Sequence, residues 1–233
     1  GIFRANPSIV KDPEVIDEIT YREMRELSYA GFGVFHDEAL QPLHKDRIPV
    51  VIKNTNRPND IGTYIRHDRE INSNNVISGI SCDKDFTVLN IKKYLMNRQV
   101  GFTRKILGVL EDYEISFDHM PSGIDSISII MRSKEIQHRE EQVLNDIRER
   151  CDVDELSVEH DLAVLMIVGE GMHRIIGTAN TITHALAEAN INLKMMNQGA
   201  SEISIMFGID VSDAEKAVKS TYEYCYNGQC LKI

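Results

Sequence analysis

The feature that most constrains the fold is an internal repeat in the last two thirds of the chain. When the sequence is aligned with itself so that Val88 matches Val164, apolar residues match apolar residues and glycines match glycines. The other matching pairs are Leu89 and Leu165, Ile91 and Ile167, Gly101 and Gly177, Leu110 and Leu186, Ile115 and Ile191, Met120 and Met196, Gly123 and Gly199, and the segments 127–129 and 203–205. Because strand-like, helix-like and glycine positions all match in one register, we infer two copies of one supersecondary unit.

Each copy shows the pattern of a βαββαβ unit. The first copy predicts strands at 86–91, 115–117, 127–129 and 156–158, and helices at 102–113 and 136–147. Alternation with period two indicates the half-buried strands, and apolar residues at helical spacing indicate the helices. The expected fold class is therefore α+β, with each copy a ferredoxin-like sandwich whose helices lie on one face of an antiparallel sheet.

The second copy lacks a closing strand. It predicts strands at 162–168, 191–196 and 203–207 and helices at 175–189 and 214–225, after which only positions 227–233 remain. The apolar segment 76–80 stands before the first copy without a partner. We therefore predict that this segment completes the sheet of the second copy and that the first copy is inserted within the second. The predicted domains are 1–66, a linker at 67–75, 82–160, and 76–81 together with 161–233.

The segment 1–66 reads as part of an α/β domain. Thr20 and Glu23 match a capping box, so a helix is expected to begin there. A second helix is expected near positions 37–45, with Ala39, Leu40 and Leu43 inward. The apolar run at 50–52 is typical of a buried strand. The polar stretch that follows Arg66 and ends in Asn-Ser-Asn-Asn favours a linker.

Composition excludes several classes of function. The formal net charge is −10, which disfavours binding to nucleic acid and to anionic membrane surfaces. The longest apolar run, at 162–168, is far shorter than the ~20 residues that span a bilayer. Four cysteines without paired spacing are typical of reduced thiols in a cytoplasmic protein. The segment 36–38 (His-Asp-Glu) is interpreted as helix-capping acids, and no metal site is predicted.

Several motifs resemble a known enzyme family. Two modules of this size are the pattern of ACT domains, which bind amino acids and regulate metabolic enzymes. The segments 1–10, 19–27, 48–56 and 62–63 resemble the end of the catalytic domain of aspartate kinases, and 169–172, 191–192 and 198–204 resemble the family's second ACT module. The resemblance covers essentially the whole chain. Because Gly1 stands where a Met would begin a protein, we expect a piece of a longer kinase.

The resemblance implies transfer of the γ-phosphoryl group of ATP, with magnesium, to the β-carboxylate of aspartate. The family's Gly-rich, Lys-containing motif is absent from this sequence, so no catalytic residue is assigned and the chain alone is expected to be inactive. The match to the family's nucleotide pocket gives Phe3, Asn6 and Pro7. Ser8 and Gly33 stand where many members carry Arg and Lys, which weakens the case for phosphate contacts from these segments.

The resemblance also places an effector site in the first ACT module. Its residues are Met96, Arg98, Gln99, Gly101, Phe102, Asp118 and Ser122. The carboxylate of an amino acid suits the N–H groups at a helix start, and Gly101 allows close backbone approach. Lysine is the first candidate and threonine the second; if lysine binds, Asp118 should receive an ammonium group. Packing for Met96 and simple surface charge for Arg98 and Asp118 remain open alternatives.

The expected mechanism is feedback inhibition by an end-product amino acid, in a cytoplasmic homodimer that pairs through its ACT modules. No nucleic-acid or membrane partner is expected. One alternative function is a stand-alone amino-acid sensor without a kinase, which the kinase-like segment 1–65 disfavours. Another is a fusion to homoserine dehydrogenase, as in some relatives. A nucleotide site at 169–171 is a weak alternative, because the glycine spacing does not fit a dinucleotide fingerprint.

Overall fold

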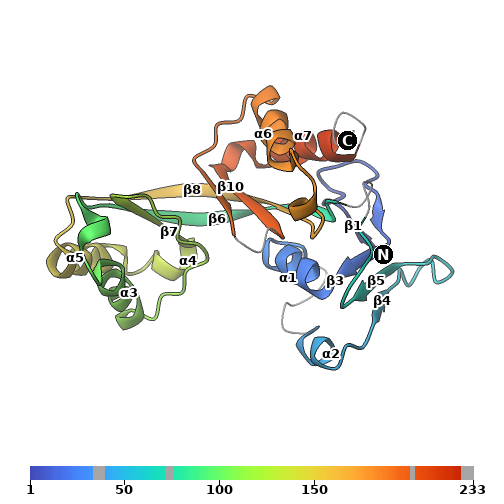
Figure 1. The fold of residues 1–233 in the computed structure, drawn as a ribbon, viewed down its shortest axis with the longest axis horizontal. Coiled ribbons are helices and arrows are strands. Elements are labelled where there is room, and N and C mark those ends of the chain that lie inside the picture. The colour runs from blue at the N-terminus through green and yellow to red at the C-terminus, as the bar shows by residue number, and fades with distance from the viewer. Residues whose placement is uncertain (34–39, 72–75, 200–202, 227–233) are drawn as a thin grey trace. The chain divides into compact units, whose positions relative to one another are not determined.

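A computed structural model describes residues 1–33, 40–71, 76–199 and 203–226 (Figure 1). The chain divides into two compact units. We call Gly1–Asp83 with Ala163–Ile233 the composite unit and Lys84–Leu162 the inserted unit. Two long strands, β6 (Gly79–Lys92) and β8 (Glu155–Val168), contribute residues to both units. The inserted unit thus begins and ends within these two strands.

The inserted unit contains a sheet with the order β7-β6-β8 and two long helices. Its elements besides β6 and β8 are η2 (Met96–Arg98), α3 (Phe102–Asp112), β7 (Ser126–Arg132), α4 (Ser133–Ile136) and α5 (Glu140–Cys151). Strands β6 and β7 are antiparallel, with Phe86 opposite Arg132 and Lys92 opposite Ser126. Phe102, Ile106 and Leu110 lie on one buried face of α3, as their spacing predicts, and pack with Val143 and Ile147 of α5.

Two predictions for this unit are wrong. The segment 115–117 does not form a strand. Only isolated bridges, His119 with Ile130 and Ser122 with Ile127, pair the following segment with β7. The single helix predicted over 136–147 is instead two helices, because α4 ends at Ile136 and α5 begins only at Glu140.

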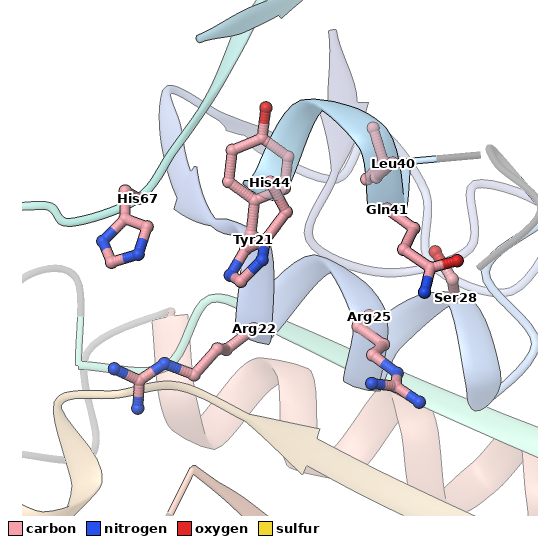
Figure 2. Close-up of a pocket in the computed structure, with 8 residues that line it drawn as sticks. All are labelled: Tyr21, Arg22, Arg25, Ser28, Leu40, Gln41, His44 and His67. Carbon is pink, nitrogen blue, oxygen red and sulfur yellow. The ribbon is translucent and has the colours of Figure 1, made fainter. Parts of the chain in front are cut away.

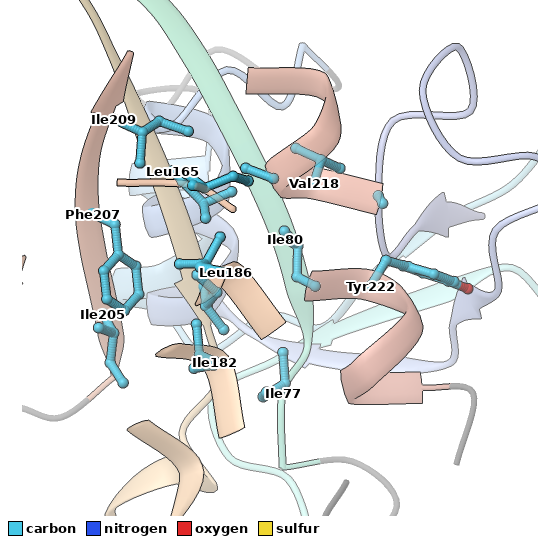
Figure 3. Packing of buried hydrophobic residues seen from close by; sticks show 14 of the residues in the cluster. Ile77, Ile80, Leu165, Ile182, Leu186, Ile205, Phe207, Ile209, Val218 and Tyr222 are labelled. Carbon is cyan, nitrogen blue, oxygen red and sulfur yellow. The ribbon is translucent and has the colours of Figure 1, made fainter. Parts of the chain in front are cut away.

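The second repeat forms its sheet within the composite unit, in the order β6-β8-β10-β9. Its further elements are η3 (Met172–Arg174), α6 (Thr178–Glu188), β9 (Met195–Gln198), β10 (Ser204–Asp210), η4 (Val211–Asp213) and α7 (Ala214–Tyr226). Figure 3 shows Ile182 and Leu186 of α6 and Val218 of α7 packed on side chains of the sheet, including Phe207. Strand β9 begins at Met195, so the strand predicted from position 191 starts later than expected.

The segment 76–80 pairs with the second repeat, as the incomplete repeat predicts. The Ser78 N–H donates to the Val168 carbonyl over 2.7 Å, and β6 neighbours β8 in the sheet. Gly169 is required at this point, because a Cβ there would lie 2.1 Å from the Val76 carbonyl oxygen. Close backbone approach therefore explains this glycine without a nucleotide. The predicted domain boundaries themselves stay a prediction.

The remaining elements of the composite unit come from the segment 1–66. They are β1 (Ile2–Phe3), β2 (Val15–Ile16), β3 (Glu18–Thr20), α1 (Tyr21–Tyr29), α2 (Gln41–Lys45), β4 (Val50–Ile52) and β5 (Thr63–Arg66). Strand β5 lies between β3, to which it is parallel, and β4, to which it is antiparallel. The capping box at Thr20 and Glu23 is confirmed. Of the helix predicted over 37–45, positions 37–39 lie outside the described residues.

Strand β4 differs from its prediction in burial. The apolar run at 50–52 predicts a buried strand, but β4 is an edge strand and Val51 is 40% exposed. A continuous apolar run cannot by itself distinguish an edge strand from a central one. The buried side chains of this region instead come from α1 and β5, where Met24, Leu27 and Ile65 pack together with Val168 of β8. The segment 1–66 and the second repeat therefore share one core.

Candidate functional site

A pocket lies where the first repeat passes from strand to helix, in the inserted unit. It has a volume of about 290 Å³ and is lined by residues of η2, the start of α3 and the segment before β7. Five of the seven residues predicted for the effector site line it: Met96, Gln99, Gly101, Phe102 and Ser122. The structure therefore brings together most of a set chosen from sequence alone.

The local backbone explains the shape of this pocket. Gly101 has φ +79°, a left-handed conformation that favours glycine, and stands immediately before α3. The turn η2 precedes it, and the Gln99 N–H donates to the Met96 carbonyl over 3.0 Å. The pocket thus opens at the N-terminus of an 11-residue helix, where the helix dipole favours a negative group. Arg104 on the first turn of α3 also lines it and was not singled out from the sequence.

Two predicted effector residues lie outside the described lining of this pocket. Arg98 is exposed on η2. The Asp118 carboxylate instead lies 3.9 Å from Nε of Arg132, whose guanidinium stands 4.2 Å from the centroid of the Phe86 ring. Burial raises the pKa of Asp118, although the Arg132 charge opposes this shift. Asp118 is therefore held by a residue of β7 in this structure.

A second pocket brings together the residues predicted for the nucleotide. It has a volume of about 230 Å³ and is lined by Phe3, Asn6 and Pro7 together with the segment 31–33, and by residues of β6 and α7. Asn6 shapes the turn, because its side-chain oxygen accepts from both the N–H and the hydroxyl of Ser8, over 3.0 and 2.9 Å. No lysine or arginine is part of its described lining, so it could hold the ring edge of a nucleotide better than its phosphates.

Two family models match separate segments near the two ends of the chain. A model of the amino acid kinase family matches residues 1–54, and an ACT domain model matches residues 165–224. Aspartokinase 3 of Bacillus subtilis is 46% identical over 98% of this chain and 50% of its own length. A crystal structure of Clostridium acetobutylicum aspartate kinase superposes with a TM-score of 0.91 at 43% identity, over 96% of this chain and 52% of that one.

Over nearly its whole length, the chain is similar to aspartokinases. It carries the end of the kinase domain and the ACT regulatory region, and it spans about half the length of the curated and solved relatives given above. Two crystal structures of E. coli aspartokinase III share the fold, at 23% and 22% identity and TM-scores of 0.80 and 0.76. They cover 96% and 97% of this chain and 50% and 49% of theirs. One holds aspartate and ADP (R-state), the other lysine and aspartate (T-state).

In this chain, a buried carboxylate that is paired with an arginine joins the segment 1–66 to the second ACT repeat. Glu23 on α1 accepts from Nε and Nη2 of Arg69 over 2.8 and 2.6 Å, from the Ser78 hydroxyl over 2.7 Å and from the Glu170 N–H over 2.7 Å. The side chains of Glu23 and Arg69 are 0% and 1% exposed. Burial would raise the pKa of Glu23, but its hydrogen bond to Arg69 and the Arg69 charge lower it overall.

This contact shows where sequence reasoning fell short. The capping box marks Glu23 as a helix-start residue but gives no sign of its partners. Arg69 lies in the stretch 67–75, which was interpreted as a linker, and its side chain is anchored in the composite unit instead. The sequence pattern around an arginine in a polar stretch is the same whether its side chain is solvated or buried against a carboxylate. Only the fold shows the difference.

The last helix anchors the segment that carries Phe3, Asn6 and Pro7. The Tyr222 hydroxyl accepts from the Glu14 N–H over 2.8 Å, and the Tyr226 hydroxyl donates to the Ile77 carbonyl over 3.1 Å. Arg4 donates to the same carbonyl over 2.9 Å and its guanidinium lies 4.9 Å from the centroid of the Tyr226 ring. Burial raises the pKa of Tyr226 far above its usual value.

Two further observations concern metals and membranes. Within residues 1–33, 40–71, 76–199 and 203–226, no group of three or more His, Cys, Asp or Glu side chains is placed to hold a metal ion. Among the described helices, none combines the length and the apolar character that crossing a membrane requires.

Proposed function

We propose that this chain is the part of an aspartate kinase that binds an end-product amino acid for feedback inhibition. The observation that carries the proposal is the pocket at the start of α3, in which five residues predicted for the effector site come together. E. coli aspartokinase III, which shares the fold, was crystallised with lysine and aspartate in its T-state. Lysine is therefore the first candidate for the effector and threonine the second.

The chemistry of the pocket suits the α-carboxylate of an amino acid. Backbone N–H groups in the first turn of α3 and the guanidinium of Arg104 both favour a negative group at this end of the helix. Met96 and Phe102 supply apolar contacts for the stem of a side chain. An ammonium group could donate to Ser122 and to the Gln99 side chain, which both line the pocket. It could also pair with Asp118 if that carboxylate moves from Arg132 to the ligand. Lysine binding would thus exchange one cation for another at Asp118.

For the whole enzyme we propose transfer of the γ-phosphoryl group of ATP to the β-carboxylate of aspartate, with magnesium as the metal. From this chain, Phe3, Asn6 and Pro7 would border the nucleotide through an aromatic face and a tight turn. The pocket's described residues offer no cation for phosphates and no carboxylates for magnesium, so those contacts must come from elsewhere in the enzyme. We therefore expect this chain alone to lack kinase activity.

Inhibition follows if the effector binds the inactive state of the kinase more tightly than the active one. We propose that two ACT regions pair in a cytoplasmic homodimer and that the effector changes how they pair. The Glu23 carboxylate, which is paired with Arg69, accepts from the Glu170 N–H and so attaches the segment 1–66 to the ACT region. A stand-alone sensor has no evident need for that attachment.

The test is calorimetric titration of the chain with lysine, threonine and methionine. We expect one of the first two to bind. Arg104→Met should weaken binding by about tenfold or more, since hydrogen bonds to charged groups contribute roughly 1.5–3 kcal/mol. Asp118→Ala should do the same if lysine is the effector. Arg148→Met and Glu149→Ala, on the exposed face of α5, are matched controls that should bind normally. If no amino acid binds, or if Arg104→Met binds as the controls do, the proposed site is wrong.

A further inference from the structure

A larger cavity lies in the composite unit, between helices α1 and α2, and neither pocket described above includes it. Its volume is about 500 Å³, within the range of small-molecule sites. The eight lining residues shown in Figure 2 are Tyr21, Arg22, Arg25 and Ser28 of α1, Leu40, Gln41 and His44 at α2, and His67 after β5. Tyr21, Arg25 and Ser28 are spaced at i, i+4 and i+7, so one face of α1 forms its floor.

The lining is strongly biased toward positive groups. Two arginines and two histidines face the cavity, and no carboxylate is part of its described lining. Arg22 lies 3.7 Å from Oε1 of Glu170, which neutralises part of its charge. Arg25 forms no ion pair with any residue in the described part of the chain. Among the described residues, the lining thus leaves Arg25 as a cation without a paired carboxylate.

The aromatic side chains of the cavity are held in place by one another. The Tyr21 and His44 rings meet edge to face with centroids 5.4 Å apart, and the His44 and His67 rings are stacked with centroids 5.5 Å apart. The Tyr21 hydroxyl donates to the Ile48 carbonyl, and Nδ1 of His67 lies 3.0 Å from the Asp68 carboxylate. Preorganised donors bind an anion with less loss of side-chain entropy than mobile ones.

A polar side chain in the cavity also has an unused hydrogen-bonding group. The Ser28 hydroxyl oxygen is shielded from solvent and has no hydrogen-bond partner among the described residues. A buried hydroxyl without a partner costs free energy, so a ligand oxygen that accepts from it would be stabilised. Gln41 lines the same cavity and offers both a donor and an acceptor.

We propose that this cavity binds a small phosphorylated molecule, with its phosphate at Arg25, His44 and Ser28. Arginine suits phosphate because its planar guanidinium donates two parallel hydrogen bonds, and a histidine ring N–H adds a third donor. The stacked rings of His44 and His67 offer a flat surface for the rest of the molecule. A phosphate that also reached Arg22 would draw it away from Glu170, so binding would be linked to the contact between α1 and the second ACT repeat.

The test is titration of the chain with inorganic phosphate and with adenosine monophosphate at constant ionic strength, followed by the ring-proton signals of His44 and His67. We expect both histidine signals to move with either probe. Tighter binding of the monophosphate would identify a phosphorylated metabolite as the natural ligand. Equal affinity would identify free phosphate. Following the two histidines separates this site from any binding at Phe3 and Asn6.

Substitutions in the cavity test whether the phosphate binds there. Arg25→Gln and His44→Gln should each raise the dissociation constant about tenfold or more, whereas Arg57→Gln, in the exposed loop before β5, should leave it unchanged. Arg25 and His44 are exposed, so neither change should affect folding, and thermal melting would check this. The proposal is overturned if neither probe moves the two histidine signals at millimolar concentration, or if Arg25→Gln and Arg57→Gln bind equally.

Discussion

The carboxylate of Glu23 and the guanidinium of Arg69 form a two-point ion pair that is removed from solvent. The distances from Nε to Oε2 and from Nη2 to Oε1 are 2.8 and 2.6 Å. The same carboxylate accepts from the backbone of Glu170 and from Thr20, so it ties α1 to the glycine turn after β8. This acidic side chain thus adds a buried polar contact to the hydrophobic core that the segment 1–66 shares with the second ACT repeat.

Removing either partner should therefore destabilise the composite unit. Arg69→Met leaves a buried carboxylate without its cation, and a loss of roughly 3–5 kcal/mol is expected in urea unfolding. Arg66→Met is the matched control, because the ion pair of Arg66 with Glu18 is about half exposed and should contribute at most about 1 kcal/mol. Equal losses in the two variants would show that the buried pair has no special importance.

The pH dependence of stability should carry the signature of Glu23. Its pKa in the folded chain is lowered from the ordinary 4.5, so the stabilisation is complete above that pH and is lost as the pH falls toward the folded value. Glu23→Gln should flatten this acid limb of the stability curve. The measurement is the urea midpoint between pH 3 and 6 for both proteins. An unchanged slope in the variant would contradict the role given to Glu23.

Gly169 should tolerate no side chain. The Cβ of Gly169→Ala would lie 2.1 Å from the Val76 carbonyl oxygen, so the paired segment must shift, at a cost of roughly 1–3 kcal/mol. Gly108→Ala, within α3 and with no atom within 4 Å of the new Cβ, should instead stabilise by roughly 0.5–1 kcal/mol. Thermal melting of both variants checks the opposite signs. A neutral Gly169→Ala would mean that the segment 76–77 does not pack there.

The two repeats should respond separately to equivalent core changes. Leu110→Ala and Leu186→Ala remove matched, fully buried side chains of α3 and α6, and each should cost roughly 2–5 kcal/mol. Hydrogen exchange should show lost protection in the inserted unit for the first variant and in the composite unit for the second. A uniform loss of hydrogen-exchange protection across both units in either variant would contradict the division of the chain into an inserted and a composite unit.

Much of this fold could be predicted because the repeat is strongly patterned. Matched pairs such as Leu110 and Leu186 occupy the same buried helix position, and the unpaired segment 76–80 could be assigned by counting strands. The strand predicted at 115–117 is wrong because an alternating pattern does not guarantee a neighbouring strand with which to form hydrogen bonds. The burial predicted for β4 is wrong because burial at a sheet edge depends on residues far away in sequence. Hydrophobic periodicity indicates which side chains of a segment face the core. It does not indicate which other elements pack beside that segment.

The candidate site was predictable to a similar degree. Residues close to Gly101 could be grouped from sequence because the turn and the helix start place them together. Asp118 could not be placed, because its ion pair with Arg132 depends on how the segment before β7 meets that strand. The cavity at Arg25 and His44 had no sequence signal, since it forms between two helices that carry no shared motif.

The central claim is that the pocket at the start of α3 binds an amino acid, and amide chemical-shift mapping with lysine and then threonine tests it most directly. The account predicts that one of them shifts the amides of residues 96–104 and 118–127, and that Arg104→Met suppresses those shifts. Shifts confined to other residues, or none with either amino acid at saturating concentration, would contradict it.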